Sequence, residues 1–381
     1  MADDPELFEP DRRAGAPHPR TALHLFGQEA AEASLRDALN AGRLHHAWLL
    51  TGPQGIGKAT LAWRIAKYLV ANPPVPDDGP GLFGEAPAPR TDTLDTDPDH
   101  PAVQRIMAEG EKALFVLRRG LTDQGRPATR IGIDEARKLR GFFALSLPDG
   151  GRRVVIVDSA DEMSPQAANA LLKSLEEPPR DTVFLIVCHQ PARLLPTIRS
   201  RCRVLRLAPL GADNLGQALA QATGSAPEGA ALDALTALSD GSPGAAITLM
   251  EAGGPALYAR LVALMASLPG LDRALALQLA AAGAARRTPA AFEMTVQLTQ
   301  TALARLARHG ATGQPLPEAA EGEGAMHARL APHPQAARAW AEAAGHLAAT
   351  ARRGQAVNLD PSTLLLDMFH GLQTTARSLP A

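Results

Sequence analysis

Residues 52–60, GPQGIGKAT, nearly match the pattern G-x-x-x-x-G-K-[ST] of a phosphate-binding loop. The loop follows an apolar run, HHAWLLT at 45–51, and precedes KATLAWRIAKYLVA at 58–71, whose apolar residues recur at helical spacing. A buried strand, a glycine-rich loop and a helix, in that order, are the structural context that such a loop requires. We therefore expect this loop to be a real element of the fold.

The loop departs from the pattern at one position that matters for catalysis. A working loop has a lysine that reaches the β/γ-phosphates and a Ser or Thr hydroxyl that ligates Mg²⁺. Lys58 is present, but Ala59 stands where the hydroxyl is expected, and Thr60 comes one residue late and points elsewhere on a helix. Two interpretations stay open. Either the loop binds ATP or ADP without hydrolysis, or its glycines persist because a tight strand-to-helix turn needs them. The residues of this degenerate nucleotide site would be Gly52, Gly55, Gly57, Lys58, Thr60 and Asp158.

Strand and helix patterns alternate through the first half of the chain, which predicts an α/β domain with a doubly wound parallel sheet. Further buried strands are expected within 113–119, 152–158, 182–188 and 202–207, with helices within 131–146 and 164–179. From 211 onward, Ala- and Leu-rich helical patterns dominate. The predicted domains are a mobile tail at 1–20, the α/β domain at 21–210 with an irregular insertion at 73–100, a helical lid at 211–250 and a helical oligomerisation domain at 251–381.

Composition limits the classes of protein to which the chain can belong. It has 381 residues, a net charge of −2, 45% hydrophobic and 20% charged residues, which is ordinary for a globular protein. No run of 18 apolar residues occurs and the first residues are too acidic for a secretory signal, so we expect a cytoplasmic protein without a membrane partner. The two cysteines, Cys188 and Cys202, lack the paired short spacings of a structural zinc site, and no metal site is predicted.

Two motifs, in order after the phosphate loop, resemble the bacterial clamp-loader subunits of the AAA+ class. They are NALLKSLEEPP at 169–179 and IRSRC at 198–202, supported by GSPGAA at 241–246 and NLDPSTLLLDMF at 358–369. The resemblance covers about residues 24–370. It implies an AAA+ P-loop domain followed by a small helical lid and an all-helical collar. The zinc-binding cysteines of this family are missing, and the insertion lies where that module would sit.

The resemblance also assigns roles at the nucleotide site. Asp158 is the strand-end acid that supports Mg²⁺, and Ser159 stands where active relatives carry a glutamate. Cys188 replaces a polar residue of the first sensor, and Gly244 replaces the arginine of the second. Together with Ala59, four positions of one site are eroded. We expect no intrinsic ATP turnover, because a serine cannot act as a general base near neutral pH.

Ser200-Arg201-Cys202, by contrast, is intact. In clamp loaders this arginine projects into the ATP site of the neighbouring subunit, where a guanidinium stabilises charge on the transferring phosphoryl group. Arg201 is therefore the predicted catalytic residue, acting in trans. The alternative is that it only caps a helix or pairs with a surface acid.

The resemblance leads to a functional prediction. The chain should be a stationary, non-hydrolysing subunit of the DNA polymerase III clamp loader, within the DNA polymerase III holoenzyme. Its partners would be gamma/tau ATPase subunits and the delta subunit in a pentameric ring, the sliding clamp, and primer-template DNA through the assembly. One alternative is an active AAA+ motor subunit of the same loader. Another is an unrelated P-loop kinase, which would leave the SRC motif and the helical C-terminus without a role.

Overall fold

The chain folds into two compact units, which are described separately. Unit 1 comprises residues 1–225 with 242–244, and unit 2 comprises 226–241 with 245–381. The division into a lid and an oligomerisation domain stays a prediction. Within the described part of the chain, no helix is both long enough and apolar enough to span a bilayer. The computed structural model describes residues 9, 12–13, 15–73, 90–122, 124–145, 151–285 and 290–379.

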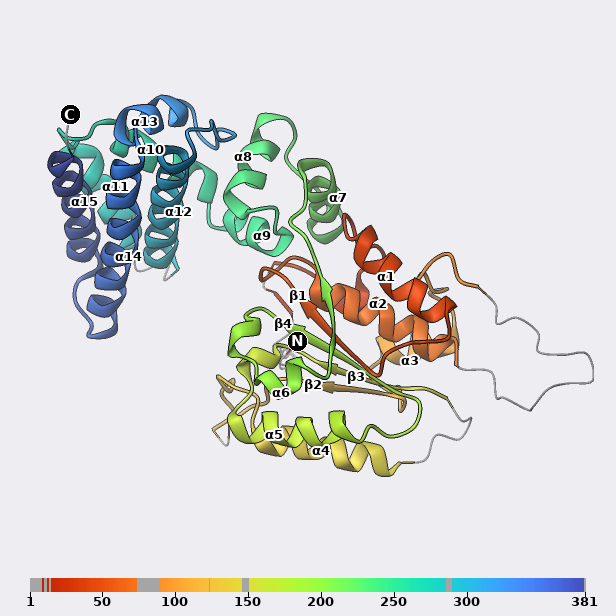
Figure 1. The fold of residues 1–381 in the computed structure, drawn as a ribbon. Coiled ribbons are helices and arrows are strands. Elements are labelled where there is room, and N and C mark those ends of the chain that lie inside the picture. The colour runs from red at the N-terminus through yellow and green to blue at the C-terminus, as the bar shows by residue number, and fades with distance from the viewer. Residues whose placement is uncertain are drawn as a thin grey trace, which may run out of the picture. The chain divides into compact units, whose positions relative to one another are not determined.

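Unit 1 is built on a sheet of five parallel strands in the order β2-β3-β4-β1-β5 (Figure 1). Strand β1, which leads into the phosphate loop, lies between β4 and β5, and β5 is an edge strand. Parallel strands need crossover connections, which here contain helices, so both faces of the inner strands are covered. The strands span Ala47–Thr51 (β1), Leu114–Leu117 (β2), Arg153–Val157 (β3), Thr182–Cys188 (β4) and Arg203–Arg206 (β5).

Helices pack on both faces of this sheet and give unit 1 two apolar cores (Figure 1). Alternate residues of each strand supply the two cores, as Trp48 and Leu49 of β1 do. On one face lie α1 (Glu29–Asn40), α2 (Lys58–Ala71) and α3 (Pro101–Met107), and on the other lie α4 (Ile133–Ala144), α5 (Pro165–Glu176) and the short α6 (Pro196–Arg199). The predicted doubly wound α/β fold is confirmed. Unit 1 also contains α7 (Ala212–Thr223) and the 3₁₀ turns η1 (Pro19–Thr21), η2 (Ala160–Glu162) and η3 (Pro191–Arg193).

The predicted mobile tail is wrong at its C-terminal end. His18 is only 4% exposed, and its ring packs edge-on against Trp63 of α2 at a centroid distance of 5.5 Å. Arg20 pairs with Glu9 and with Glu109. The packing of His18 on Trp63 and the ion pairs of Arg20 hold this segment against unit 1, although its composition is polar. Residues 1–8 lie outside the described residues.

The predicted insertion at 73–100 falls partly outside the described residues, at 74–89. Its described residues 90–100 contain no helix or strand, as expected, but they pack closely on unit 1. Leu94 is 2% exposed within the apolar core, and Asp95 accepts a hydrogen bond from Arg64 of α2 at 3.0 Å. Helix α3, which follows, was not predicted. At seven residues it is too short for a clear helical period.

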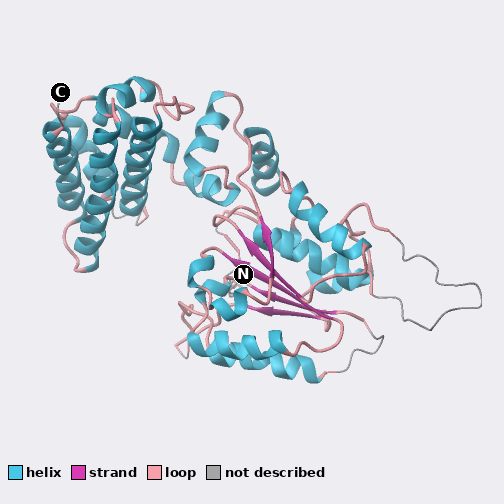
Figure 2. Cartoon of the chain, viewed as in Figure 1, coloured by secondary structure: helices cyan, strands magenta, loops and turns pink. Residues whose placement is uncertain are grey.

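Unit 2 contains only helices among its described residues (Figure 2). Its longest helices, α12 and α14, pack side by side, and α15 packs against α14 and α11. The predicted all-helical C-terminal region is confirmed. The helices span Ala230–Ser239 (α8), Pro243–Glu251 (α9, which begins in residues of unit 1), Gly254–Ala266 (α10), Arg273–Gly283 (α11), Ala291–Thr312 (α12), Glu323–Leu330 (α13), Pro334–Ala356 (α14) and Pro361–Ser378 (α15).

A buried polar cluster fixes α13 to α12 and α10 in unit 2. Glu323 is 1% exposed and accepts hydrogen bonds from Arg305 Nε at 2.7 Å, Tyr258 Oη at 2.5 Å and the backbone N–H of Ala319 at 2.7 Å. Burial by itself would raise the pKa of Glu323, but the bonds from Arg305 and Tyr258 outweigh it and hold the pKa below its usual value. The carboxylate is therefore charged and paired.

Candidate functional site

The phosphate loop has the backbone geometry that its glycines permit. Gly52, Gly55 and Gly57 have φ of 146°, 78° and 103°, and Gly57 is the N-cap of α2. A Cβ at Gly52 would lie 2.8 Å from the carbonyl oxygen of Leu207, which follows β5. The turn thus requires glycines for its own backbone. This supports the interpretation in which they are structural, and leaves nucleotide binding open.

Lys58 lies inside the loop and contacts the loop's own backbone. Its side chain is 2% exposed, and Nζ donates to the carbonyl oxygens of Gly52 at 2.7 Å and Pro53 at 2.5 Å. Burial lowers the pKa of Lys58 to about 8, although Asp161, Cys188 and other nearby groups oppose the shift. The two hydrogen bonds show that the ammonium group of Lys58 is directed at carbonyl oxygens of the loop.

The two residues after Lys58 lie in the first turn of α2. Successive side chains of an α-helix differ by about 100° around the axis. Thr60 therefore points away from the direction of Ala59, where a metal-binding hydroxyl would be needed. On this geometry Thr60 cannot replace the hydroxyl that Ala59 lacks, and the degenerate nucleotide site stays a prediction.

The carboxyl ends of β3 and β4 bring together residues that are far apart in the sequence. Asp158 follows β3, and Ser159 after it has a left-handed backbone with φ of 59°, which is costly for a serine. The Ser159 hydroxyl is hydrogen-bonded to His189 Nε2 at 3.2 Å. Asp161 accepts from the backbone N–H groups of His189 at 2.9 Å and Gln190 at 3.2 Å. Asp161 thus anchors the end of β4, and no glutamate stands at position 159.

Two side chains at the end of β4 are held neutral. Burial, with a smaller effect from Lys58, lowers the pKa of His189 to about 4. Burial and Asp161 raise the pKa of the Cys188 thiol to about 12. Neither group has a pKa suited to abstracting a proton from water near pH 7. The sequence did not predict the bond between Ser159 and His189, although the two residues lie within two positions of the ends of neighbouring parallel strands.

The segment Ser242–Gly244 packs on the phosphate loop within unit 1. Ser242 Oγ donates to the carbonyl oxygen of Gln54 at 2.8 Å, and the backbone N–H of Gly244 donates to the carbonyl oxygen of Gly55 at 3.0 Å. A Cβ on Gly244 would lie 2.8 Å from Gly55 Cα. Any side chain at position 244, an arginine included, would require the two backbones to separate.

Arg201 lies just after α6 and is 37% exposed. Its Nη2 pairs with Glu176 Oε1 of α5 at 2.9 Å, and its Nη1 donates to the carbonyl oxygen of Thr197 at 2.9 Å. Ser200 and Cys202 also donate to carbonyl oxygens of α6. These are the contacts that the alternative interpretation of Arg201 predicts, a helix cap and a surface acid. The trans-acting role stays a prediction.

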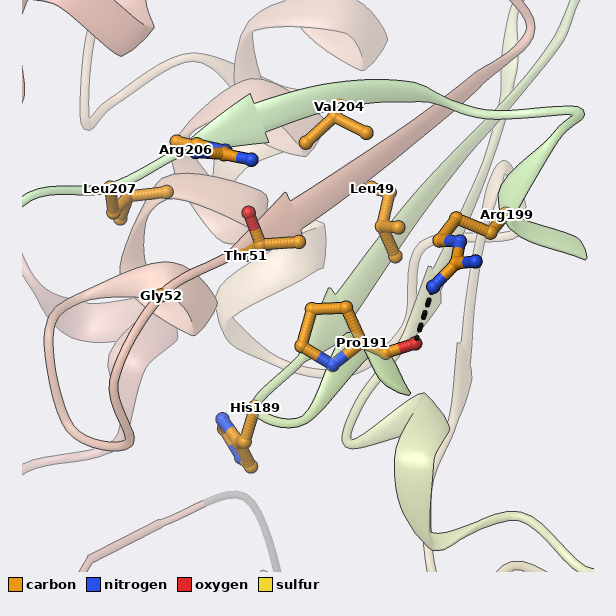
Figure 3. Close-up of a pocket in the computed structure, with 9 residues that line it drawn as sticks. All are labelled: Leu49, Thr51, Gly52, His189, Pro191, Arg199, Val204, Arg206 and Leu207. Carbon is orange, nitrogen blue, oxygen red and sulfur yellow. Dashed lines mark hydrogen bonds between the residues drawn. The ribbon is translucent and has the colours of Figure 1, made fainter. Parts of the chain in front are cut away.

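A cavity of about 520 Å³ lies beside the phosphate loop (Figure 3). Its walls come from β1, β5, α6 and the ends of β1 and β4, and include Thr51, Gly52, His189, Arg199 and Arg206. In Figure 3 Arg199 and Arg206 occupy different parts of the wall. No local pattern in the sequence predicts this cavity, because its residues come from four separate segments.

Comparison with known proteins shows that part of the chain is similar to subunits of DNA polymerase III. Residues 27–211 match the family model described as DNA polymerase III, delta subunit. The chain is 42% identical over 199 residues to the DNA polymerase III subunit delta prime of Pseudomonas aeruginosa, covering 52% of this chain and 53% of that protein. It is 32% identical over 211 residues to the Escherichia coli K12 delta prime subunit, covering 55% and 56%. The chain thus spans about half the length of the curated relatives it matches.

Other matches are to gamma-type subunits. The gamma/tau subunit of Mycobacterium tuberculosis H37Rv is 32% identical over 190 residues, covering 48% of this chain and 28% of that protein. Among solved structures, a DNA polymerase III gamma subunit-related protein of Thermotoga maritima aligns with a TM-score of 0.42 at 17% identity, covering 90% of this chain and 100% of that one. Residues 27–211 thus match the DNA polymerase III delta-subunit model, and the chain is similar to delta prime subunits over about half of its length.

Proposed function

We propose that the chain is the delta prime subunit of a bacterial DNA polymerase III clamp loader and does not itself hydrolyse ATP. The family match over 27–211 and the delta prime relatives support this role over that of a motor subunit, because the Pseudomonas aeruginosa delta prime subunit is 42% identical to the chain and the Mycobacterium tuberculosis gamma/tau subunit 32%. The proposed partners are gamma/tau and delta subunits in a ring, the sliding clamp and primer-template DNA. The proposed location is the cytoplasm.

The observation that supports the non-hydrolysing role is that three groups needed for hydrolysis are replaced, at positions 59, 159 and 244. Ser159 bonds to His189 where a general base is needed, and Ala59 offers no metal ligand. Gly244 touches Gly55 where a sensor arginine would need room. ATP hydrolysis requires a positioned water and Mg²⁺ against the β/γ-phosphates. The described residues of this site supply neither a base nor a metal-ligating hydroxyl at those positions.

The contribution proposed for this subunit in the ring is Arg201. A guanidinium offers a planar fork of donors that matches phosphoryl oxygens, and its effect falls mainly on charge that develops in the transition state. Arg201 is partly exposed and its contacts within the chain are at the surface. Exposed pairs of this kind contribute only about 0–1 kcal/mol, so a partner's phosphate can compete for the guanidinium.

The direct test is ATP turnover by the purified full-length chain. We expect none above background, with or without primed DNA. Robust turnover that Lys58→Ala abolishes would contradict the proposal and favour the motor subunit. The kinase alternative is tested in the same assay with candidate small-molecule acceptors added, since phosphoryl transfer consumes ATP only when an acceptor is present.

A further inference from the structure

The cavity beside the phosphate loop lies in an unusually basic part of the chain. Residues 182–212 include five arginines and no aspartate or glutamate. Arg201 is held by Glu176, and Arg203 lies over the ring of Trp48 at 5.0 Å. These two guanidiniums therefore have partners within the chain.

Arg199 and Arg206 line the cavity and differ from those two. Neither forms an ion pair within the described ranges of the chain. Arg199 Nη1 donates to the carbonyl oxygen of Pro191 at 3.4 Å, which is a long hydrogen bond and leaves most of its donors available. None of the residues described as lining the cavity is acidic. The wall thus offers two guanidiniums for an anion that the chain itself does not supply.

The floor of the cavity is apolar. Leu49 of β1 pairs in register with Val204 of β5, so both side chains point to the same face of the sheet, and Leu207 follows β5. Leu49 is fully buried, but Val204 is 47% exposed because β5 is the edge strand and its face is left partly uncovered. Exposed apolar surface beside charged groups is typical of a binding surface.

These features favour a protein ligand over a nucleic acid. A phosphate backbone needs no apolar floor, and stacking of bases needs aromatic side chains. The residues that line the cavity include no Phe, Tyr or Trp among those described. The volume of about 520 Å³ holds one or two side chains and a short backbone stretch. Guanidinium groups pair well with carboxylates.

We propose that this cavity docks a segment of a partner protein in which an apolar side chain stands next to an aspartate or glutamate. The apolar side chain lies on the exposed Val204, and the carboxylate pairs with Arg199 or Arg206. The proposal rests on the proposed function in one respect, because it takes the partner from the other subunits of the clamp loader. It is independent of Arg201, which does not line the cavity.

The test is site-specific photo-crosslinking in the reconstituted assembly. A benzoylphenylalanine replaces Val204 in the full-length chain, which is combined with gamma/tau and delta subunits, clamp and primed DNA. The same probe at Leu23, which is 63% exposed and does not line the cavity, is the control. We expect the probe at 204 to capture a subunit segment with Asp or Glu within two residues of an apolar residue.

Charge-reversal variants distinguish binding by the two cavity arginines from a general effect of the basic segment. Arg199→Glu with Arg206→Glu should lower the crosslink yield at least fivefold, whereas Arg193→Glu, in the same basic segment but outside the cavity, should not. Four outcomes would each overturn the inference. The probe could capture only DNA, or a segment without Asp or Glu. The double reversal could leave the crosslink yield unchanged, or the probe could capture nothing although the assembly forms. If the chain does not join the assembly, the proposed function fails, and this inference fails with it.

Discussion

Arg201 is the residue that our proposed function assigns to the ATP site of a neighbouring subunit, and it also makes contacts within its own chain. Its pair with Glu176 and its bond to the Thr197 carbonyl define one position for the guanidinium. A group positioned before its ligand arrives loses less entropy on binding. On the proposed function, Glu176 is therefore a positioning residue for Arg201.

Glu176→Ala should lower the share of ring ATP turnover that depends on Arg201 by about 1.4- to fivefold, which corresponds to about 0.2–1 kcal/mol for an exposed pair. That share is defined as the turnover lost in Arg201→Ala. The loss should fall on kcat and not on KM for ATP, and Glu176→Gln, which keeps an acceptor oxygen, should restore part of it. The matched control is Glu177→Ala, an exposed neighbouring acid outside this pair. A further loss when Glu176→Ala is added to Arg201→Ala would contradict the positioning role.

Gly244 is a second residue whose identity the structure explains. A Cβ there would meet the backbone of Gly55 at 2.8 Å, and backbone cannot move aside as a flexible side chain does. Gly244→Ala should destabilise unit 1 by about 1–3 kcal/mol, as overpacking does. Gly141→Ala is the control: a Cβ there meets nothing within 4 Å inside α4, so this change should stabilise by about 0.5–1 kcal/mol. Urea midpoints of the full-length variants give the comparison, and equal effects of the two changes would refute the contact.

At the scale of elements, α13 depends on the buried carboxylate of Glu323. Glu323→Gln keeps the size of the side chain but leaves the guanidinium of Arg305, which is 7% exposed, without a counter-charge. Breaking a buried pair in this way costs about 3–5 kcal/mol. We expect a large fall in the urea midpoint of unit 2 in the full-length chain, while Glu321→Gln, at an exposed position just before α13, changes it little. A midpoint that Glu323→Gln leaves unchanged would show that the cluster contributes nothing to stability.

His327 gives the same cluster a dependence on pH. It is 2% exposed, with Nε2 3.5 Å from Glu323 Oε1, and burial lowers its pKa below the model-peptide value of 6.5 even though Glu323 opposes the shift. A group whose pKa is lower in the folded state binds more protons when unfolded, so stability falls as the pH falls below about 6.5. We expect the urea midpoint to be lower at pH 5.5 than at 7.5.

His327→Gln tests this dependence. It should reduce the difference between the two midpoints without abolishing it, because burial also lowers the pKa of His46 and His189 in unit 1. The control is His346→Gln, since His346 lies on α14 outside the cluster. A pH dependence that is the same in the wild type and in His327→Gln would contradict the assignment.

At the scale of the whole molecule, the sequence predicted what local patterns determine. The strand before Gly52, the loop itself, and the helix that Ser164 caps and Pro165 begins all lie where periodicity and capping place them. Contacts between segments far apart in the chain could not be predicted from the sequence. Nothing local indicates that His189 reaches Ser159, or that Tyr258 and Arg305 meet at Glu323. Such contacts depend on how the strands and helices are packed.

At the candidate site, too, the sequence predicted the types of residue but not the contacts between them. The types of residue at positions 58, 59, 159 and 244 indicated a degenerate nucleotide site, because each position has a known chemical requirement. The direction of Lys58 and the closeness of Gly244 to Gly55 required the folded chain. The cavity wall, which combines residues of β1, α6 and β5, could not be inferred before the sheet order was known.

The central claim is that this chain joins a clamp loader without contributing a hydrolytic site of its own. The most direct measurement is steady-state ATP turnover of a loader reconstituted with gamma/tau and delta subunits, clamp and primed DNA, with this chain either wild type or carrying Lys58→Met. The methionine keeps an apolar stem in the loop, and an unchanged urea midpoint verifies that the chain folds. We predict that full turnover and clamp loading require the chain and are the same for both variants. Turnover that falls by the share of one active site in the Lys58→Met loader, or that does not require the chain at all, would contradict the claim.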